Sequence, residues 1–168
     1  MIKQSVRDAI NQQITKEMYS SNLYLAMASY FHTVNLNGFA NWMRIQAQEE
    51  MMHAIKFFDY LINRGGEVKL GQIAAPPQQW DSPLSAFEAA YEHEQLVTAS
   101  INEMAGLSLQ ESDHATNVFL HWFITEQVEE EATVSEIVDR LRLAGDSKSS
   151  LFILDNELKQ RTLPAGQE

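Results

Sequence analysis

Glycine and proline are scarce in this chain, and their positions limit what it can fold into. The sequence has seven glycines and four prolines in 168 residues. They gather mainly at short breaks, and because these two residues are the strongest helix breakers, the long intervals between the breaks can be continuous helices. We expect helices at about residues 5–33, 39–64, 83–108, 114–144 and 148–158.

The lengths of the connections predict how the four long helices are arranged. A short turn at residues 35–38 joins the first two helices and fits antiparallel neighbours. The connection over residues 66–82 has roughly 17 residues, enough to run the length of a bundle. We therefore predict an all-α, up-down-down-up four-helix bundle with one long crossover and a short fifth C-terminal helix, in a single domain over residues 1–168.

The predicted inner face of each long helix is apolar at both ends and acidic in the middle. These faces consist of residues spaced alternately by three and four. The central acidic residues are Glu17, Glu50, Glu94 and Glu130. Each lies roughly 11 to 16 residues from its helix start, and antiparallel helices match in height near their midpoints. The four carboxylates should therefore share one transverse layer of the bundle.

Such a layer requires a counterion. Burying a lone carboxylate costs several kcal/mol, and carboxylates at one depth repel one another unless they are protonated or neutralised. The basic residues near these stretches all lie off the predicted inner faces; they are Lys16, Arg44, Lys56 and Arg64. A bound divalent or trivalent cation is therefore the expected counterion.

The ligands in this layer favour iron or manganese. Glu50 and His53 are three residues apart, so both point from one helical face to the same place. Carboxylate-rich sites with one imidazole suit iron and manganese, whereas zinc normally gathers more nitrogen or sulfur. Because the chain has no cysteine, thiolate sites are excluded. An oxygen-rich site with one histidine is therefore expected.

The same residues partly match the pattern of di-iron carboxylate bundles. In those bundles two helices supply one Glu each, and the other two supply a Glu-x-x-His pair. Here Glu17 and Glu94 supply the single residues, and Glu50 with His53 supplies one pair. The fourth helix has the sequence QVEE at residues 127–130, where the second pair would lie.

Several motifs occur together along the chain, and none would be specific alone. They are Glu17 followed by Tyr24 one heptad later, Glu49-Glu50-x-x-His53, Glu94, the segment EQVEE at residues 126–130, the long connection and the short fifth helix. In this combination the chain resembles the ferritin family, specifically the bacterial non-haem ferritins, over essentially its whole length. The resemblance implies two irons bridged by Glu50. Glu17 and His53 complete the first, and Glu94 and Glu130 the second, with Gln127 beside it.

The resemblance also implies a third iron next to this pair, bound by Glu49, Glu126, Glu129 and Glu130. From the residues alone, three of these lie one position off the predicted inner faces, where acidic residues are commonly solvated. Tyr24 would be a hydrogen-bonding partner and electron donor near the irons. The alternative, an ordinary core tyrosine, stays open.

As implied by the resemblance, the activity is that of a ferroxidase. Fe(II) would be oxidised by dioxygen or H₂O₂ and stored as a ferric oxyhydroxide mineral inside a hollow homo-oligomeric shell of 24 chains, with the fifth helix around fourfold axes. The apolar segment 151–154 independently indicates that this helix is buried.

Haem is not expected. Segment 127–130 lacks the second Glu-x-x-His of the related haem-binding bacterioferritins. Met51 does fall where their haem-ligating methionine lies, but methionine is also a common core residue.

Two other classes of function remain open on the residues alone. One is a cation-binding bundle without oxidase activity, and the other is a di-iron oxygenase acting on an organic substrate. Oxidation of added Fe(II) would separate the first from a ferroxidase. The second is disfavoured by the small chain and the missing second Glu-x-x-His.

Charge and composition limit the partners and the location. The 23 acidic and 12 basic residues give a net charge of −11, which disfavours nucleic acid and anionic lipid and favours cations. Residues 1–7 lack the apolar core of a signal peptide, and no window approaches a membrane span. With cysteine absent, a cytoplasmic location is the simplest expectation.

Overall fold

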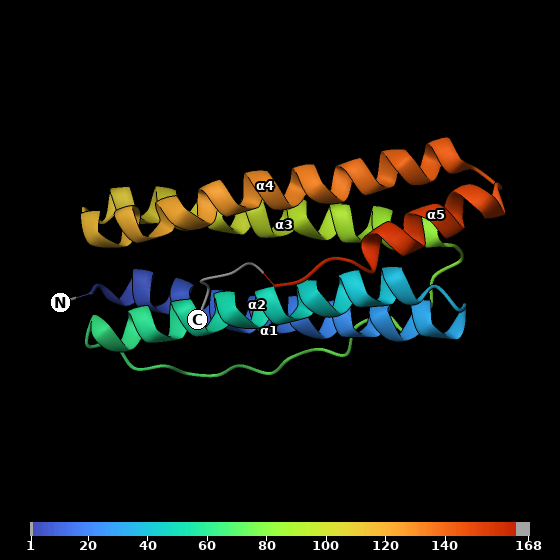
Figure 1. The fold of residues 1–168 in the computed structure, drawn as a ribbon. Helices are drawn as coiled ribbons and strands as arrows, with labels where there is room; N and C mark the ends of the chain where they lie inside the picture. The colour runs from blue at the N-terminus through green and yellow to red at the C-terminus, as the bar shows by residue number, and fades with distance from the viewer. Residues whose placement is uncertain (1, 164–168) are drawn as a thin grey trace.

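The computed structural model describes residues 2–163 and forms an all-helical bundle (Figure 1). Residues 1 and 164–168 of the predicted domain lie outside the described range. The helices are α1 (Gln4–Thr33), α2 (Asn37–Asn63), α3 (Pro83–Gln110), α4 (His114–Ala144) and α5 (Lys148–Leu158). Their ends lie within about two residues of the predicted positions.

The helices form two antiparallel pairs that pack face to face. In Figure 1, α1 lies beside α2 and α3 beside α4, and the crossover at residues 64–82 runs along the first pair to reach the start of α3. The short α5 packs at one end of the bundle against α2 and α4. The predicted all-α class and its up-down-down-up order with one long crossover are therefore confirmed.

Local chemistry explains where the helices begin and end. The Ser82 hydroxyl accepts a hydrogen bond from the Ser85 amide, and the Ser85 side chain reciprocates, which forms a capping box in front of Pro83. Asp113 caps α4 in the same way, through the amide of Thr116. Gly65 ends α2 with a φ of +71°, a conformation that costs glycine little.

The apolar core is divided into two clusters at opposite ends of the bundle. One includes Phe31, Phe39 and Phe87, and the other includes Phe57 and Phe123. Between them lies a buried polar layer, whose members are Gln13, Glu17, Ser20, Gln46, Glu50, His53, Glu94, Gln127 and Glu130. The predicted pattern of apolar ends and an acidic middle is thus present in three dimensions.

The fifth helix is attached to the bundle by an aspartate that caps another helix. Asp155 Oδ1 accepts hydrogen bonds from the amides of Gly38 and Phe39, at 2.8 and 3.1 Å, in the first turn of α2. A Cβ on Gly38 would lie 1.6 Å from the Asp155 carbonyl oxygen, so only glycine fits there. α5 also buries Leu154 and Leu158.

Only part of the apolar surface of α5 is buried in this chain. Segment 151–154 was expected to be buried, but Phe152 and Ile153 remain 66% and 58% exposed. These two side chains point away from the bundle because Leu154 and Leu158 already form the contact with it. The surface therefore keeps an apolar patch at this end.

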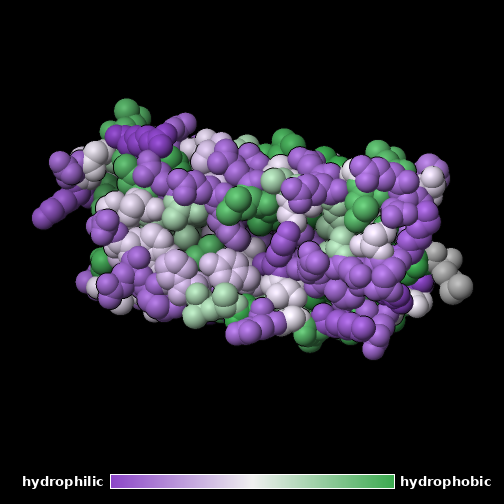
Figure 2. Space-filling model, turned by 180° about the vertical axis from the view of Figure 1, so that it is seen from behind, coloured by the Kyte–Doolittle hydropathy of each residue, from purple (hydrophilic) through white to green (hydrophobic). Residues whose placement is uncertain are grey.

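The surface is otherwise mainly polar. Figure 2 shows the bundle from behind, where hydrophilic residues cover much of the face and apolar groups lie between them. None of the helices in residues 2–163 combines the length and the apolarity that a membrane crossing requires.

The contact between α5 and α2 generates the first prediction. Replacing Asp155→Ala removes the acceptor for two amides of α2, so we expect a loss of about 1–2 kcal/mol in the free energy of unfolding. Gly38→Ala should displace α5 through steric overlap and speed hydrogen exchange of its amides. Asp155→Asn keeps an acceptor oxygen and serves as the control. Equal stability of Asp155→Ala and the wild type would contradict the capping role.

Candidate metal centre

Four carboxylates meet in the polar layer, one from each long helix. Glu17, Glu50 and Glu94 are at most 1% exposed, and Glu130 is 8% exposed. The four helices place them at one height because each lies near the middle of its helix, with apolar turns on either side. The predicted transverse layer is present.

The ligand atoms of these residues fall into groups close enough to hold a metal ion. Within each group, one ligand atom per residue lies within 4.8 Å of the others. One group is Glu17, Glu50 and His53, and another is Glu50, Glu94 and Glu130. Glu50 belongs to both, so its two oxygens can serve two neighbouring ions. This geometry is compatible with the bridged pair that the resemblance implies, which stays a prediction.

Three buried atoms in the same place have no hydrogen-bond partner among residues 2–163. They are Glu17 Oε2, Glu50 Oε2 and His53 Nε2. Buried polar atoms are nearly always paired, because leaving one unpaired costs about 1–3 kcal/mol. Glu50 Oε2 also lies 3.6 Å from His53 Nδ1. Unpaired oxygens and a nearby imidazole are what a cation would satisfy, so the donor set fits a metal.

Side-chain amides hold three of the carboxylates in position. Gln13 Nε2 donates to Glu17 Oε1 at 2.8 Å. Gln46 Nε2 donates to Glu50 Oε1 at 3.0 Å and to Glu130 Oε2 at 2.6 Å. Partners of this kind fix the orientation of metal ligands. No motif in the sequence singles out these two glutamines for this role.

Glu94 is held by two other residues. The Tyr24 hydroxyl donates a hydrogen bond to Glu94 Oε1, and Gln127 Nε2 donates to Glu94 Oε2 at 3.2 Å. Gln127 therefore contacts Glu94, a member of the second group. Tyr24 is fully buried and packs edge-on against Trp42 and His93. Its phenol is positioned by the structure to act on Glu94.

The close packing of acids shifts their titration. Burial and the charge of Glu50 raise the pKa of Glu94 to about 8 and the pKa of Glu17 well above its usual range. Burial also disfavours the ionised form of Glu50, but a hydrogen bond and a charge interaction with His53 lower the pKa of Glu50 below its usual value. Burial opposes protonation of His53 as well, yet Glu50 and Glu17 raise its pKa to about 9. When no metal is bound, protons supply the positive charge that neutralises part of this layer.

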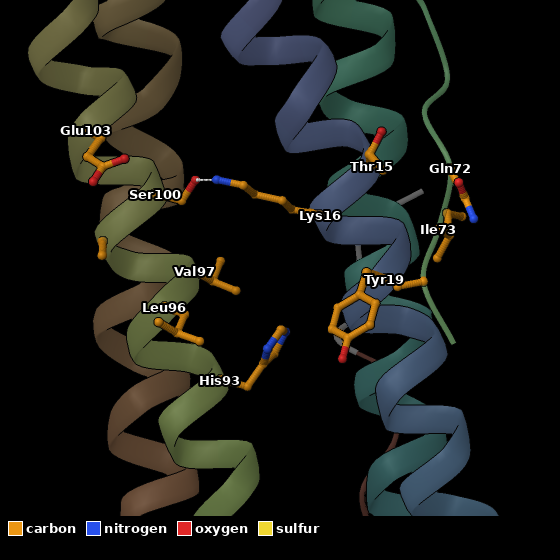
Figure 3. Close-up of a pocket in the computed structure, with 12 residues that line it drawn as sticks. Thr15, Lys16, Tyr19, Gln72, Ile73, His93, Leu96, Val97, Ser100 and Glu103 are labelled. Atoms are coloured by element: carbon orange, nitrogen blue, oxygen red, sulfur yellow. Dashed lines mark hydrogen bonds between the residues drawn. The ribbon is translucent and has the colours of Figure 1, made fainter. Parts of the chain in front are cut away.

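On the α1–α3 side, a hydrogen-bond chain runs from the layer to the surface. The Ser100 hydroxyl donates to Gln13 Oε1 at 2.6 Å and accepts from Lys16 Nζ at 2.6 Å (Figure 3). Gln13 in turn donates to Glu17. The exposed ammonium of Lys16 is therefore connected to a buried carboxylate through two neutral side chains.

A pocket of about 520 Å³ opens beside this chain, between α1, α3 and the crossover. Figure 3 shows His93 pointing into the space between the two helices, opposite Tyr19. His93 Nε2 lies 2.8 Å from the Ser20 hydroxyl, and its ring packs against Tyr24. His93 is half-buried, next to the side chain that contacts Glu94.

On the opposite side, the layer contacts a residue that the sequence did not single out. Arg161 lies beyond α5 and forms an ion pair with Glu49. It also donates to Gln46 Oε1 at 2.8 Å. No spacing or motif connects Arg161 with α2, because the contact is made across more than a hundred residues of chain.

The structure brings together only part of the predicted third site. Glu126 lies within a possible metal group with His53 and Glu130. Glu129 is exposed, and Glu49 is buried against Arg161. Neither belongs to any of the possible metal groups among the described residues. The third site therefore stays a prediction.

These pKa values generate a prediction about proton release. At pH 7 Glu94 and His53 both carry a proton, because their pKa values of about 8 and 9 lie above that pH. A cation binds the ionised carboxylate and the neutral imidazole, so binding must expel protons, and affinity should rise with pH up to about 9. Calorimetric titration with Co²⁺ in two buffers of different ionisation enthalpy measures the number released.

The variant Glu94→Gln should release fewer protons, whereas Glu136→Gln, on the exposed face of α4, should match the wild type. Identical binding heats in the two buffers would contradict the assignment of raised pKa values to Glu94 and His53.

Known proteins with the same fold and related sequences place the chain in a family. Residues 7–144 match the Ferritin-like domain of the ferritin family. A bacterial non-heme ferritin of Bacteroides fragilis is 46% identical over 161 residues, covering 96% of this chain and 100% of that protein. One from Escherichia coli O6:H1 is 37% identical, covering 94% and 96%.

A solved structure agrees with this match. The structure of an open-pore ferritin from the hyperthermophilic archaeon Archaeoglobus fulgidus superposes with a TM-score of 0.96 at 52% identity, covering 96% of this chain and 100% of that one. The family model spans most of the helical bundle and the relatives span nearly the whole chain, so this protein belongs to the ferritin family.

Proposed function

We propose that this protein stores iron and is a ferroxidase, which oxidises Fe(II) with dioxygen or H₂O₂ and deposits the product as a ferric oxyhydroxide mineral. One observation carries the proposal: Glu50 is shared by two buried groups, with Glu17 and His53 on one side and Glu94 and Glu130 on the other. Membership of the ferritin family supports iron as the metal.

In this proposal each residue of the layer has a separate role. Glu17 and His53 bind the first Fe(II), Glu94 and Glu130 bind the second, and Glu50 bridges them. Each Fe(II) can give up one electron, so a bridged pair can supply two electrons to one dioxygen. The carboxylates favour the more highly charged Fe(III), because the added positive charge offsets their mutual repulsion.

The chain's own side chains prepare the site for this exchange. Gln46 holds Glu50 and Glu130 in one orientation, and Tyr24 holds Glu94. The protons on Glu94 and His53 keep the metal-free cluster from being strongly negative. Fe(II) replaces those protons on binding, and the charge of two Fe(II) ions balances the four ionised carboxylates around a neutral His53.

Storage of a mineral requires an enclosed space far larger than the pocket of about 520 Å³ beside α1 and α3. We propose a homo-oligomeric shell of 24 chains in which the exposed Phe152 and Ile153 of α5 are covered by neighbouring subunits. Two large apolar side chains that are 66% and 58% exposed in one chain support such a contact. Sedimentation of the purified protein, with electron microscopy after aerobic loading with Fe(II), tests for a shell with a dense core.

The metal assignment can be tested by removing two ligands. The double variant Glu50→Ala, His53→Ala takes away the bridge and the imidazole, so the initial rate of Fe(II) oxidation should fall at least about 100-fold. Stopped-flow absorbance after mixing Fe(II) with aerated buffer measures this rate. The exposed Glu136→Ala on α4 is the matched control and should keep the wild-type rate.

Two results would reject the ferroxidase assignment. Wild-type oxidation no faster than that of the double variant would leave a passive cation-binding bundle. After anaerobic soaking with Fe(II), anomalous diffraction should show two ions between the layer residues. No density between Glu50, His53, Glu94 and Glu130 would also reject it.

A separate prediction concerns Tyr24. Tyr24→Phe removes the hydroxyl that donates to Glu94 but keeps the buried ring, so two Fe(II) should still bind. We expect oxidation to slow about tenfold, as for other partners of metal ligands. Rapid-mix kinetics together with anaerobic binding measurements separate the two effects. An unchanged rate would make Tyr24 an ordinary core residue.

A further inference from the structure

The chain that follows α5 turns back and lies along α2. In Figure 1 this stretch runs between α2 and α4, towards the middle of the bundle. Asn41 Nδ2 lies 3.4, 3.3 and 3.0 Å from the carbonyl oxygens of Leu158, Lys159 and Arg161. Backbone contacts therefore hold the segment at residues 158–161 beside the polar layer.

The side chain of Arg161 fits a site built from α2. Its guanidinium lies 4.3 Å from the centre of the Trp42 ring and donates to the Trp42 carbonyl at 3.4 Å. One nitrogen, Nη2, bonds both the Glu49 carboxylate and Gln46 Oε1. An arginine held by an ion pair, a carbonyl, an amide and an aromatic face is a positioned cation and not a freely moving surface charge.

Arg161 is also connected to the metal ligands through one side chain. Gln46 accepts from Arg161 with its oxygen and donates with its nitrogen to Glu50 at 3.0 Å and Glu130 at 2.6 Å. A positive charge at the acceptor end of an amide polarises its donor end. The guanidinium therefore acts on Glu50 and Glu130 as well as on Glu49.

The charges around Glu49 show what Arg161 balances. The side chain of Glu49 is 7% exposed, and that of Arg161 is 22% exposed. The charges of Glu50 and Glu126 act on Glu49, and the guanidinium of Arg161 contacts it directly. Without Arg161, Glu49 would be a buried carboxylate facing two other acids. Such a cluster attracts a cation.

We propose that the Arg161 guanidinium is a resident cation that limits the cluster to two iron ions, so that a third cation binds at Glu49 only when Arg161 moves away. This inference rests on the proposed function. The partial exposure of Arg161 gives it room to leave without unfolding the bundle. A cation and the guanidinium compete for the same carboxylate, so each weakens the binding of the other.

The test counts Fe(II) bound per chain under anaerobic conditions, by equilibrium dialysis of the whole protein. Arg161→Met keeps a long apolar side chain over Trp42 and removes only the charge and the donors. We expect wild type to bind two Fe(II) tightly, and Arg161→Met to bind a third with a dissociation constant at least about fivefold lower than that of wild type.

Two further variants identify the cause of the change. Adding Glu49→Gln to Arg161→Met should abolish the gain, because Glu49 is the carboxylate set free. Arg140→Met removes another arginine that pairs with a glutamate, Glu157 of α5, away from the layer, and should bind Fe(II) as wild type does. Equal third-ion affinity in Arg161→Met and wild type, or three tight ions in wild type, would overturn the inference.

A second measurement does not depend on any variant. In crystals of the wild-type protein soaked anaerobically in rising Fe(II), density for an ion at Glu49 should coincide with loss of the Arg161 contact. If an ion binds at Glu49 while Arg161 is still paired with Glu49, the inference is overturned. The proposal of two irons at Glu50 would not be affected by that result. The absence of any ion at Glu50 would instead reject the proposed function.

Discussion

Repulsion between buried carboxylates is the constraint on which the rest of this structure depends. Four helices each place an acid at the same height, and water is excluded from the layer by apolar clusters at both ends. Each buried charge costs several kcal/mol unless it is compensated. The phenylalanines of the two end clusters supply the apolar burial that offsets this cost. The bundle can therefore fold around a layer that would not be stable alone.

Three kinds of group compensate the charge of the carboxylates, and they lie at increasing distances from the layer. Protons on Glu94 and His53 act within it. Amide donors from Gln13 and Gln46 act next to it. Two cationic side chains act at the edges of the layer. Lys16 is connected to Glu17 by hydrogen bonds through Ser100 and Gln13. Arg161 is connected to Glu50 and Glu130 through Gln46.

How much of this the sequence could predict depended on the range of each interaction. Glu50 and His53 are three residues apart on one helix, so their shared direction follows from helical geometry alone. The layer itself followed from the position of each acid within its helix. Asp155 and Arg161 could not be predicted in this way, because each acts on α2 from more than a hundred residues away. Their roles depend on how α5 docks.

Positive charge acts more strongly on one side of the layer than on the other, and this difference follows from the docking of α5. Lys16 is an exposed ammonium separated from Glu17 by two neutral groups, so solvent screens much of its effect. Arg161 is packed on Trp42 and touches Glu49 directly, where screening is weaker. Asp155 fixes α5, and α5 places the segment that carries Arg161. The cap on α2 and the charge balance of the buried carboxylate layer are therefore set by the same short helix and the residues that follow it.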